Sequence, residues 1–205
     1  MPQTETVHDN SIHLIAMLPG LFRWILHKNG WEMTHPPPAG IDRFVLVIAP
    51  HTSMWDFVWG KLILAGMGLR VKFMIKKEIF WFPLGPLLKW LGGIPVDRRR
   101  GNMMIHQVVE TLERHRGGRL TVVITPEGTR SPTTHWKKGF YRIAMSAKVP
   151  IAVGYLDYGS RTYGIVFTIE PTGDFEKDCA AIPDFYRDKV GKHPERFLLP
   201  EWKPS

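Results

Sequence analysis

The sequence predicts an α/β fold: a single domain with a mainly parallel or mixed central sheet flanked by helices. First, strand-like apolar runs alternate along the chain with segments of helical periodicity. Second, two of these runs, residues 44–49 and 120–125, lead directly into short polar loops. Third, 205 residues with 44% hydrophobic content can build one substantial core. In such folds the functional loops lie at the carboxyl ends of the strands.

The N-terminal region, residues 1–40, is expected to precede the main domain at residues 41–205. Its apolar stretch at residues 12–28 is interrupted by a proline, a glycine and an arginine, so it lacks the roughly 20 continuous apolar residues of a membrane-spanning helix. Neither a basic cluster before the stretch nor a small-residue cleavage pattern after it indicates a signal peptide. We interpret it as an interfacial helix or as a helix packed on the domain. The proline-rich residues 35–40 form the expected connector.

The rest of the chain alternates between predicted strands and helices. Runs of branched and aromatic apolar residues predict the strands, and apolar residues at every third or fourth position predict the helices. The expected strands are residues 44–49, 70–75, a short stretch within 92–100, 120–125, 150–156 and 161–170, and the expected helices are residues 56–65, 101–116, 139–148 and 174–189.

His51 and Asp56 stand at the first of the two strand exits. Pro50 cannot donate to a strand ladder, so the chain is expected to leave the sheet there and to place His51 in the exit loop. A loop-to-helix turn of five residues could bring the Asp56 carboxylate back to the imidazole. Such a pair performs general-base catalysis, because the imidazole takes a hydroxyl proton while the carboxylate fixes its tautomer. The alternative is a loop histidine beside a first-turn acid that the helix dipole favours.

The second strand exit carries the sequence Pro126-Glu-Gly-Thr-Arg130. Together the two loops resemble the glycerolipid acyltransferase family, which includes the 1-acylglycerol-3-phosphate (lysophosphatidate) acyltransferases. The family's first block, the HX4D motif, corresponds to His51 and Asp56, and its third block corresponds to residues 126–130. Residues 76–80, 83–85 and 93–98 resemble the second block and residues 149–153 the fourth, so all four blocks occur in order.

This resemblance implies a glycerol-3-phosphate acyltransferase-like fold and direct acyl transfer without a covalent intermediate. A hydroxyl of a lysophospholipid, such as lysophosphatidate, would attack the thioester of acyl-CoA or acyl-carrier protein, with His51 as the general base and Asp56 orienting it. The sequence contains no Gly-x-Ser-x-Gly elbow that would suggest a serine nucleophile. The acyl donor is a co-substrate, and no cofactor or metal ion is expected.

The resemblance also assigns substrate-binding residues in the second and third blocks. Arginine suits phosphate binding because its planar donor fork contacts two oxygens at once. The alternative is that the arginines of these blocks form structural ion pairs with neighbouring carboxylates. The expected contacts to the acceptor are phosphate binding by Arg98 and Arg130 and shaping of the pocket by Glu127, Gly128 and Thr129.

The net charge of +8 predicts an anionic partner. Nucleic acid is disfavoured because the arginines lie beside apolar runs and not in a basic stripe with stacking aromatics. An anionic membrane surface fits, since a fatty chain of about fifteen methylenes costs roughly 12 kcal/mol to expose to water. We interpret the aromatic residues 79–91 as an apolar rim that touches the bilayer or receives the acyl chain, with ordinary core packing as the alternative. The protein is expected in the cytoplasm, peripherally associated with the inner face of a membrane.

Two other functions stay open. One is the same chemistry on a different acceptor, such as an aminolipid or a secondary-metabolite hydroxyl, because Pro50 and Thr125 depart from the family pattern near substrate surfaces. The other is a non-enzymatic basic module that binds anionic lipid. The single cysteine, Cys179, excludes an internal disulfide framework, and its acidic, surface-like surroundings argue against a nucleophilic role.

Overall fold

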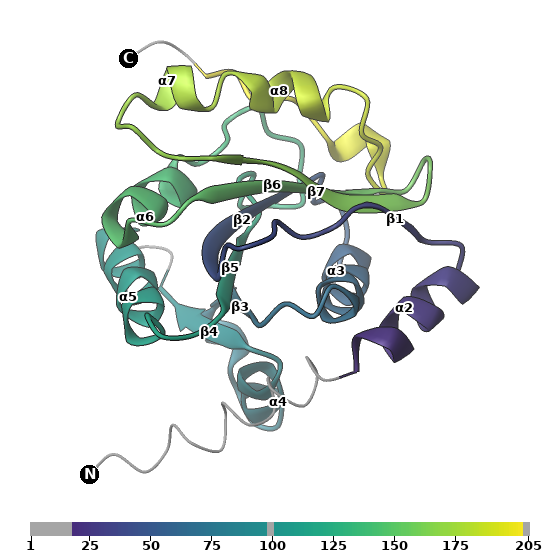
Figure 1. Ribbon diagram of the computed structural model, residues 1–205, viewed down its shortest axis with the longest axis horizontal. Coiled ribbons are helices and arrows are strands. Elements are labelled where there is room, and N and C mark those ends of the chain that lie inside the picture. The colour runs from purple at the N-terminus through teal and green to yellow at the C-terminus, as the bar shows by residue number, and fades with distance from the viewer. Residues whose placement is uncertain (1–17, 98–100, 203–205) are drawn as a thin grey trace.

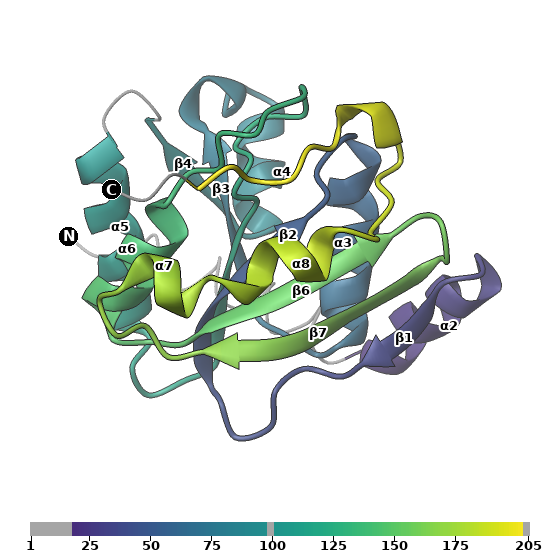
Figure 2. The ribbon, with the colours of Figure 1, turned by 90° about the horizontal axis from the view of Figure 1, so that it is seen from above.

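The computed structural model describes residues 18–97 and 101–202, and these residues form a seven-stranded mixed sheet with helices on both faces (Figures 1 and 2). This confirms the predicted α/β class. The strand order is β1-β7-β6-β2-β5-β3-β4, and every neighbouring pair is parallel except β6 with β7. The strands are β1 (Glu32–His35), β2 (Arg43–Ala49), β3 (Val71–Lys76), β4 (Gly93–Val96), β5 (Leu120–Ile124), β6 (Ile151–Asp157) and β7 (Thr162–Ile169).

Helices cover both faces of this sheet. They are α2 (Pro19–Lys28), α3 (Trp55–Gly66), α4 (Leu84–Trp90), α5 (Gly101–Arg114), α6 (Gly139–Ala147), α7 (Phe175–Asp178) and α8 (Ala181–Tyr186), with 3₁₀ turns η1 (Lys77–Ile79) and η2 (Pro194–Arg196). Helices α2 and α3 lie against one face, and α5, α6 and α8 pack against the other (Figure 1).

Strand β2 shows why the central strands read as continuous apolar runs. Consecutive side chains of a strand point to opposite faces of the sheet. Val45 and Val47 therefore join the core beneath α5 and α6, whereas Phe44 and Leu46 pack with Leu64 of α3. Because helices cover both faces, all four β2 side chains are buried and no polar alternation is needed.

The segment predicted as one helix at residues 174–189 is instead two short helices, α7 and α8, joined by a turn. A continuous helix would require an N–H at position 183 to bond the Cys179 carbonyl one turn earlier. Pro183 has no N–H to donate, so the helix has to restart. The turn also places the Cys179 side chain in the core, which corrects the expectation of a surface-like position.

Among the described strands, β1 is the one that the sequence did not predict. Its four residues are mostly exposed, so they give no strand pattern, yet they pair in parallel with β7 at the edge of the sheet. Strand β1 therefore places part of residues 1–40 in the same sheet as the strands of residues 41–205.

Helix α2 packs on the domain along one side and exposes apolar side chains on the other. Leu26 is fully buried and packs beside Gly66 of α3, whereas Trp24 on the same helix is 59% exposed. In the part of the chain that the structure describes, no helix has the length and hydrophobicity needed to cross a membrane.

Candidate active site

The carboxyl ends of three adjacent strands meet at one edge of the sheet. Strand β2 pairs in parallel with both β5 and β6. The residues that follow these strands therefore converge: His51 after β2, Glu127 after β5 and Tyr158 after β6. Of the predicted site residues, Arg98 lies outside the described residues.

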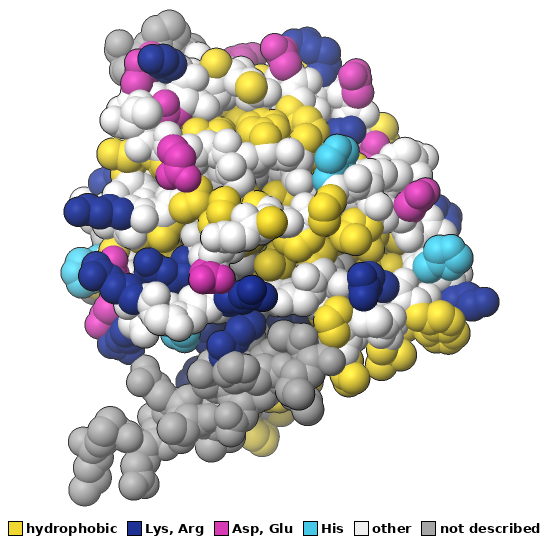
Figure 3. All heavy atoms as spheres, in the orientation of Figure 1, with side chains coloured by type: hydrophobic (Ala, Val, Ile, Leu, Met, Phe, Trp, Pro, Cys, Tyr) yellow, Lys and Arg dark blue, Asp and Glu magenta, His cyan; other side chains and the backbone are white. Residues whose placement is uncertain are grey.

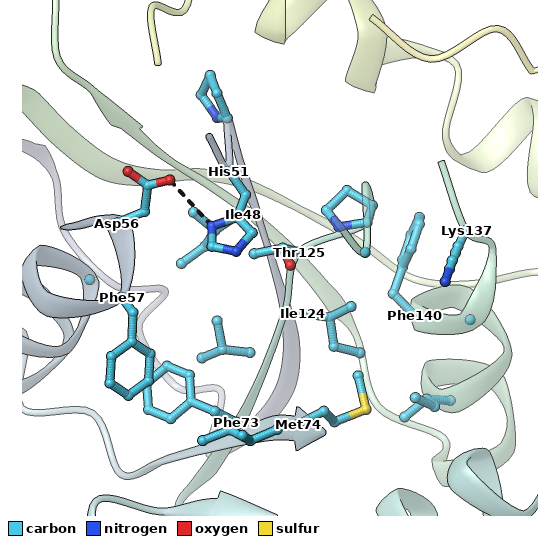
Figure 4. Close-up of a pocket in the computed structure, with 18 of the residues that line it drawn as sticks. Ile48, His51, Asp56, Phe57, Phe73, Met74, Ile124, Thr125, Lys137 and Phe140 are labelled. Carbon is cyan, nitrogen blue, oxygen red and sulfur yellow. Dashed lines mark ion pairs between the residues drawn. The ribbon is translucent and has the colours of Figure 1, made fainter. Parts of the chain in front are cut away.

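His51 and Asp56 are brought together as the spacing of the motif suggests. The His51 Nδ1 atom lies 3.3 Å from Asp56 Oδ2 (Figure 4). The same oxygen accepts the backbone N–H groups of Thr52 and Ser53 at 2.7 and 2.8 Å, so the loop closes around the carboxylate. The Tyr158 hydroxyl donates to the other oxygen, Oδ1, at 2.9 Å. The carboxylate is thus fixed from both sides and holds one edge of the imidazole.

The protonation state of Asp56 follows from these contacts. Burial raises the pKa of a carboxyl group, but here hydrogen bonds from His51, the Ser53 N–H and Tyr158 outweigh it and hold the pKa of Asp56 below its usual value. The carboxylate is therefore ionised at neutral pH. An ionised partner on Nδ1 leaves Nε2 of His51 as the nitrogen that can accept a substrate proton.

Glu127 lies behind the histidine loop. Its Oε1 atom accepts the backbone N–H of His51 at 2.8 Å, and its side chain is buried. Burial raises the pKa of Glu127 to about 7, and Oε2 has no hydrogen-bond partner within the described residues. Among these residues Glu127 also forms no ion pair with Arg130. The buried carboxyl group thus holds the backbone of the loop at His51 in place.

An apolar cavity of about 350 Å³ opens beside the His51 and Asp56 side chains. It crosses the sheet where β3 separates from β5, since their pairing ends at Phe73 and Val123. Gly128 and Lys137 lie on its wall near the second loop. The apolar part of the lining includes Met104. It also includes Phe57, Phe73, Met74, Ile124 and Phe140 (Figure 4).

Residues 79–91 do not line this cavity. The core interpretation of the segment is wrong for its aromatic part, because Trp81 is 59% and Phe82 is 84% exposed. Large apolar side chains of this kind on the surface indicate an interaction site. The exposed aromatic side chains of this segment thus lie on the surface and outside the cavity.

A second, polar hollow of about 650 Å³ lies on the other side of the His51–Asp56 loop. Loop residues 52–55 form one wall, and Thr129 and Arg130 form another. The C-terminal segment supplies the rest of the lining with Lys192, His193 and Arg196. Sequence reasoning missed these three residues and Tyr158, because only their basic or phenolic character marked them and each lies far from the motifs along the chain.

Metal-ion and cysteine chemistry depend on the placement of His, Cys, Asp and Glu side chains. In residues 18–97 and 101–202, no group of three or more His, Cys, Asp or Glu side chains is arranged to hold a metal ion. Burial raises the pKa of the Cys179 thiol to about 12, so the thiol stays protonated at neutral pH. This agrees with the expectation that Cys179 is not a nucleophile.

A family model described as acyltransferase matches residues 30–153. The chain belongs to the acyltransferase family. The match includes both motif loops of the family member, whereas the C-terminal wall of its polar hollow lies beyond the matched residues.

Curated relatives carry the name 1-acyl-sn-glycerol-3-phosphate acyltransferase. The protein of Escherichia coli K12 is 29% identical over 124 residues, which cover 58% of this chain and 49% of that protein. The protein of Salmonella typhimurium is 27% identical over 145 residues (68% and 55%), and that of Cocos nucifera is 38% identical over 80 residues (37% and 26%). The chain thus spans about half the length of the bacterial relatives and about a quarter of the coconut protein.

A solved structure supports the fold. The 1-acyl-sn-glycerophosphate acyltransferase PlsC of Thermotoga maritima matches with a TM-score of 0.56, at 21% identity, over 89% of this chain and 78% of that one. At this identity the likeness shows that the acyltransferase family member shares the PlsC fold.

Proposed function

We propose that the protein is an acyltransferase that moves a fatty acyl group from a thioester, acyl-CoA or acyl-carrier protein, to the hydroxyl of a lysophospholipid such as lysophosphatidate. The observation that carries this proposal is the His51–Asp56 pair at the mouth of an apolar cavity. Family membership and the names of the relatives support the same chemistry.

The proposed reaction is a direct transfer. Nε2 of His51 removes the proton from the acceptor hydroxyl as its oxygen attacks the thioester carbonyl. The imidazolium that forms is stabilised by the Asp56 carboxylate at Nδ1. When the tetrahedral intermediate collapses, the carbon–sulfur bond breaks, and His51 returns the proton to the departing thiolate. The products are a diacylated lipid and a free thiol.

The apolar cavity is the proposed site of the acyl chain. A chain of about fifteen methylenes gains roughly 12 kcal/mol when it leaves water, so an enzyme that handles it needs a covered apolar surface. A cavity of about 350 Å³ lies within the usual range for small-molecule sites. Its opening beside His51 would place the thioester carbonyl within reach of the acceptor oxygen.

The acceptor is proposed to enter from the polar hollow. Arg130 and Thr129 line this hollow and are the third-block residues expected to face the acceptor. Gly128 adopts a left-handed conformation with φ of 64°, and a Cβ there would lie 3.0 Å from the Lys137 side chain. Glycine at this position therefore lets the loop turn closely between the two hollows. By resemblance Arg98 would add a second phosphate contact.

The proposed place of action is the inner face of a membrane. Exposed apolar side chains occur on α2, on the first turns of α3 and around α4, and hydrophobic side chains gather on the surface over α2 (Figure 3). The largest of these are Trp24, Trp55, Trp81, Phe82 and Trp90. Aromatic residues are favoured at the boundary between lipid and water, and the net charge of +8 favours an anionic surface.

The direct test is thiol release from acyl-CoA in the presence of single lysolipids, with mass spectrometry of the lipid product. His51→Ala should abolish transfer, and Asp56→Asn should lower the rate by about 10⁴, as the loss of a triad carboxylate does. His106→Ala is the matched control, because His106 is exposed on α5 and should leave the rate unchanged.

Three outcomes would contradict parts of the proposal. Wild-type turnover by His51→Ala would refute the base assignment. If products form only from acceptors without phosphate, the natural acceptor is an aminolipid or another hydroxyl compound and not lysophosphatidate. Lipid binding without any thiol release would favour the non-enzymatic module.

A further inference from the structure

The polar hollow is completed by a segment that the family match does not include. Lys192, His193 and Arg196 follow α8, beyond the matched residues 30–153. Their segment returns over the beginning of α3 and there faces Thr129 and Arg130 (Figure 2).

Hydrogen bonds fix this segment against the catalytic loops. The backbone N–H of His193 donates to Oγ1 of Thr52 at 3.1 Å, and Thr52 directly follows His51 in the chain. Val190 is held on both sides, because its N–H donates to Asp157 and its carbonyl accepts the Tyr158 N–H at 2.9 Å. At Gly191 a Cβ would lie 2.8 Å from the Thr52 side chain, so only glycine allows this close approach. Lys192 and Arg196 are therefore presented by a fixed backbone.

The positive charges of the hollow have few carboxylate partners among the described residues. No Asp or Glu is among the described residues that line it. Within residues 18–97 and 101–202, neither Arg130 nor Lys192 forms an ion pair with a carboxylate. Lys192 Nζ instead lies 5.7 Å from the ring centres of Trp55 and Tyr158, and the Tyr158 hydroxyl binds Asp56. The positive charge of Lys192 thus lies near the aromatic ring whose hydroxyl binds Asp56.

Arg196 has one acidic neighbour. Its Nε atom lies 3.7 Å from Glu195 Oε1, and the same oxygen is 3.7 Å from His193 Nδ1. These are long contacts between exposed side chains and contribute little. The hollow therefore keeps a net positive charge from Arg130, Lys192 and Arg196.

From this arrangement we infer that Lys192 and Arg196 bind the phosphate group of a substrate together with Arg130 and so determine specificity for phosphorylated substrates. The inference rests on the proposed function and names the residues that recognise the substrate at that site. Lysine and arginine donors around an open polar hollow are suited to a phosphate, which offers several acceptor oxygens. Two substrates carry such a group, the acceptor lysophosphatidate and the donor acyl-CoA.

Steady-state kinetics of the double variant Lys192→Gln/Arg196→Gln separate the two sources. If the acceptor phosphate binds here, KM for short-chain lysophosphatidate should rise about tenfold or more, while KM for the matching monoacylglycerol should not change. If the donor phosphates bind here, KM should rise for acyl-CoA and not for the acyl-pantetheine thioester. In both cases kcat should stay near the wild-type value, because neither residue touches the reacting atoms.

A matched control variant removes the same charges elsewhere. Arg119→Gln/Lys177→Gln also loses one arginine and one lysine, and both side chains lie outside the two hollows. Arg119 pairs with Asp42 at the amino ends of the strands, away from His51. A site-specific role requires that this control keeps the wild-type KM values.

A binding assay tests the phosphate site without turnover. It measures the binding of glycerol 3-phosphate from the broadening of the ligand's phosphorus NMR signal. Wild type and the control should broaden the signal, and Lys192→Gln/Arg196→Gln should broaden it much less. If acyl transfer is absent but this difference is present, the proposed function fails and the phosphate site stands. Equal broadening and equal KM values in all three proteins would overturn the inference.

Discussion

Asp56 receives four contacts on two oxygens, from the His51 ring, two backbone N–H groups and Tyr158. Of these four contacts, the motif predicts only the one between Asp56 and the imidazole ring. The other three contacts hold the carboxylate still and keep it ionised. The rigidity of the pair therefore comes largely from groups outside the two motif residues.

The variant Tyr158→Phe tests this source of rigidity by removing one hydroxyl group that binds Asp56. Removing a hydrogen bond to a charged group should lower the free energy of unfolding by about 1.5–3 kcal/mol at pH 7. The pKa of Asp56 is depressed in the folded state, so its stabilising contribution is present above pH 3.8 and is lost as the pH falls through the folded value. Without Tyr158 that folded pKa rises, so the contribution is smaller and disappears at a higher pH.

Urea unfolding at pH 7 and pH 3 measures the effect. The difference between wild type and Tyr158→Phe should be smaller at pH 3 than at pH 7, because the pH then lies below the ordinary pKa of the carboxyl group and closer to the lowered folded value. Tyr163→Phe is the control, since the Tyr163 hydroxyl makes no hydrogen bond within residues 18–97 and 101–202 and its loss should cost the same at both pH values. A pH-independent difference for Tyr158→Phe would contradict the assignment.

Glu127→Gln tests a group whose contribution to stability changes with pH in the opposite direction to that of Asp56. Burial raises the pKa of Glu127 from 4.5 to about 7, so the folded protein binds more protons than the unfolded chain between these values. Wild type therefore loses stability from this group as the pH rises, by roughly 3 kcal/mol in total. The glutamine variant has no such loss, and its amide oxygen can still accept the His51 N–H.

The measurement is the free energy of unfolding of both proteins from pH 4 to pH 8. The value for Glu127→Gln minus wild type should increase between about pH 4.5 and pH 7 and level off above that. Glu110→Gln, which removes an exposed carboxylate paired with Arg114, should show no such increase. A flat difference for Glu127→Gln would mean that the buried carboxyl group titrates at its ordinary pKa.

At the scale of elements, the segment from η1 to α4 carries surface aromatic residues and takes no part in the cavity. Phe82→Ala should weaken binding to vesicles that contain anionic phospholipid by about tenfold or more, because burying a phenylalanine side chain contributes roughly 1.5–3 kcal/mol. Stability should stay within about 0.5 kcal/mol of wild type, since the side chain is 84% exposed.

Vesicle co-sedimentation at several lipid concentrations provides the measurement. Leu198→Ala is the control, because Leu198 is also an exposed apolar residue but lies on the C-terminal segment. Unchanged binding of Phe82→Ala would show that this segment does not enter the bilayer.

Which elements the sequence could predict depends on burial. Strands β2, β5 and β6 are covered on both faces, so their residues are almost all apolar and the strands are easily recognised. Strand β1 is mostly exposed and is stabilised by pairing with β7, which no local pattern encodes. The break between α7 and α8 depends on one proline within an otherwise helical pattern.

At the scale of the whole molecule, the same distinction applies to the site. His51 and Asp56 share one loop, so a five-residue spacing was enough to predict their meeting. Tyr158 lies 102 residues from its partner Asp56, and His193 lies 141 residues from Thr52. Such contacts depend on the strand order and on the path of the C-terminal segment, neither of which the motifs specify.

The contact between His193 and Thr52 also has a consequence for biosynthesis. Translation proceeds from the N-terminus, so a growing polypeptide contains His51 and Asp56 long before Lys192 and Arg196 are added. The wall that we propose to bind the substrate phosphate is consequently the last part of the polar hollow to leave the ribosome. Under this proposal, selectivity for phosphorylated substrates is acquired later than the proposed catalytic pair.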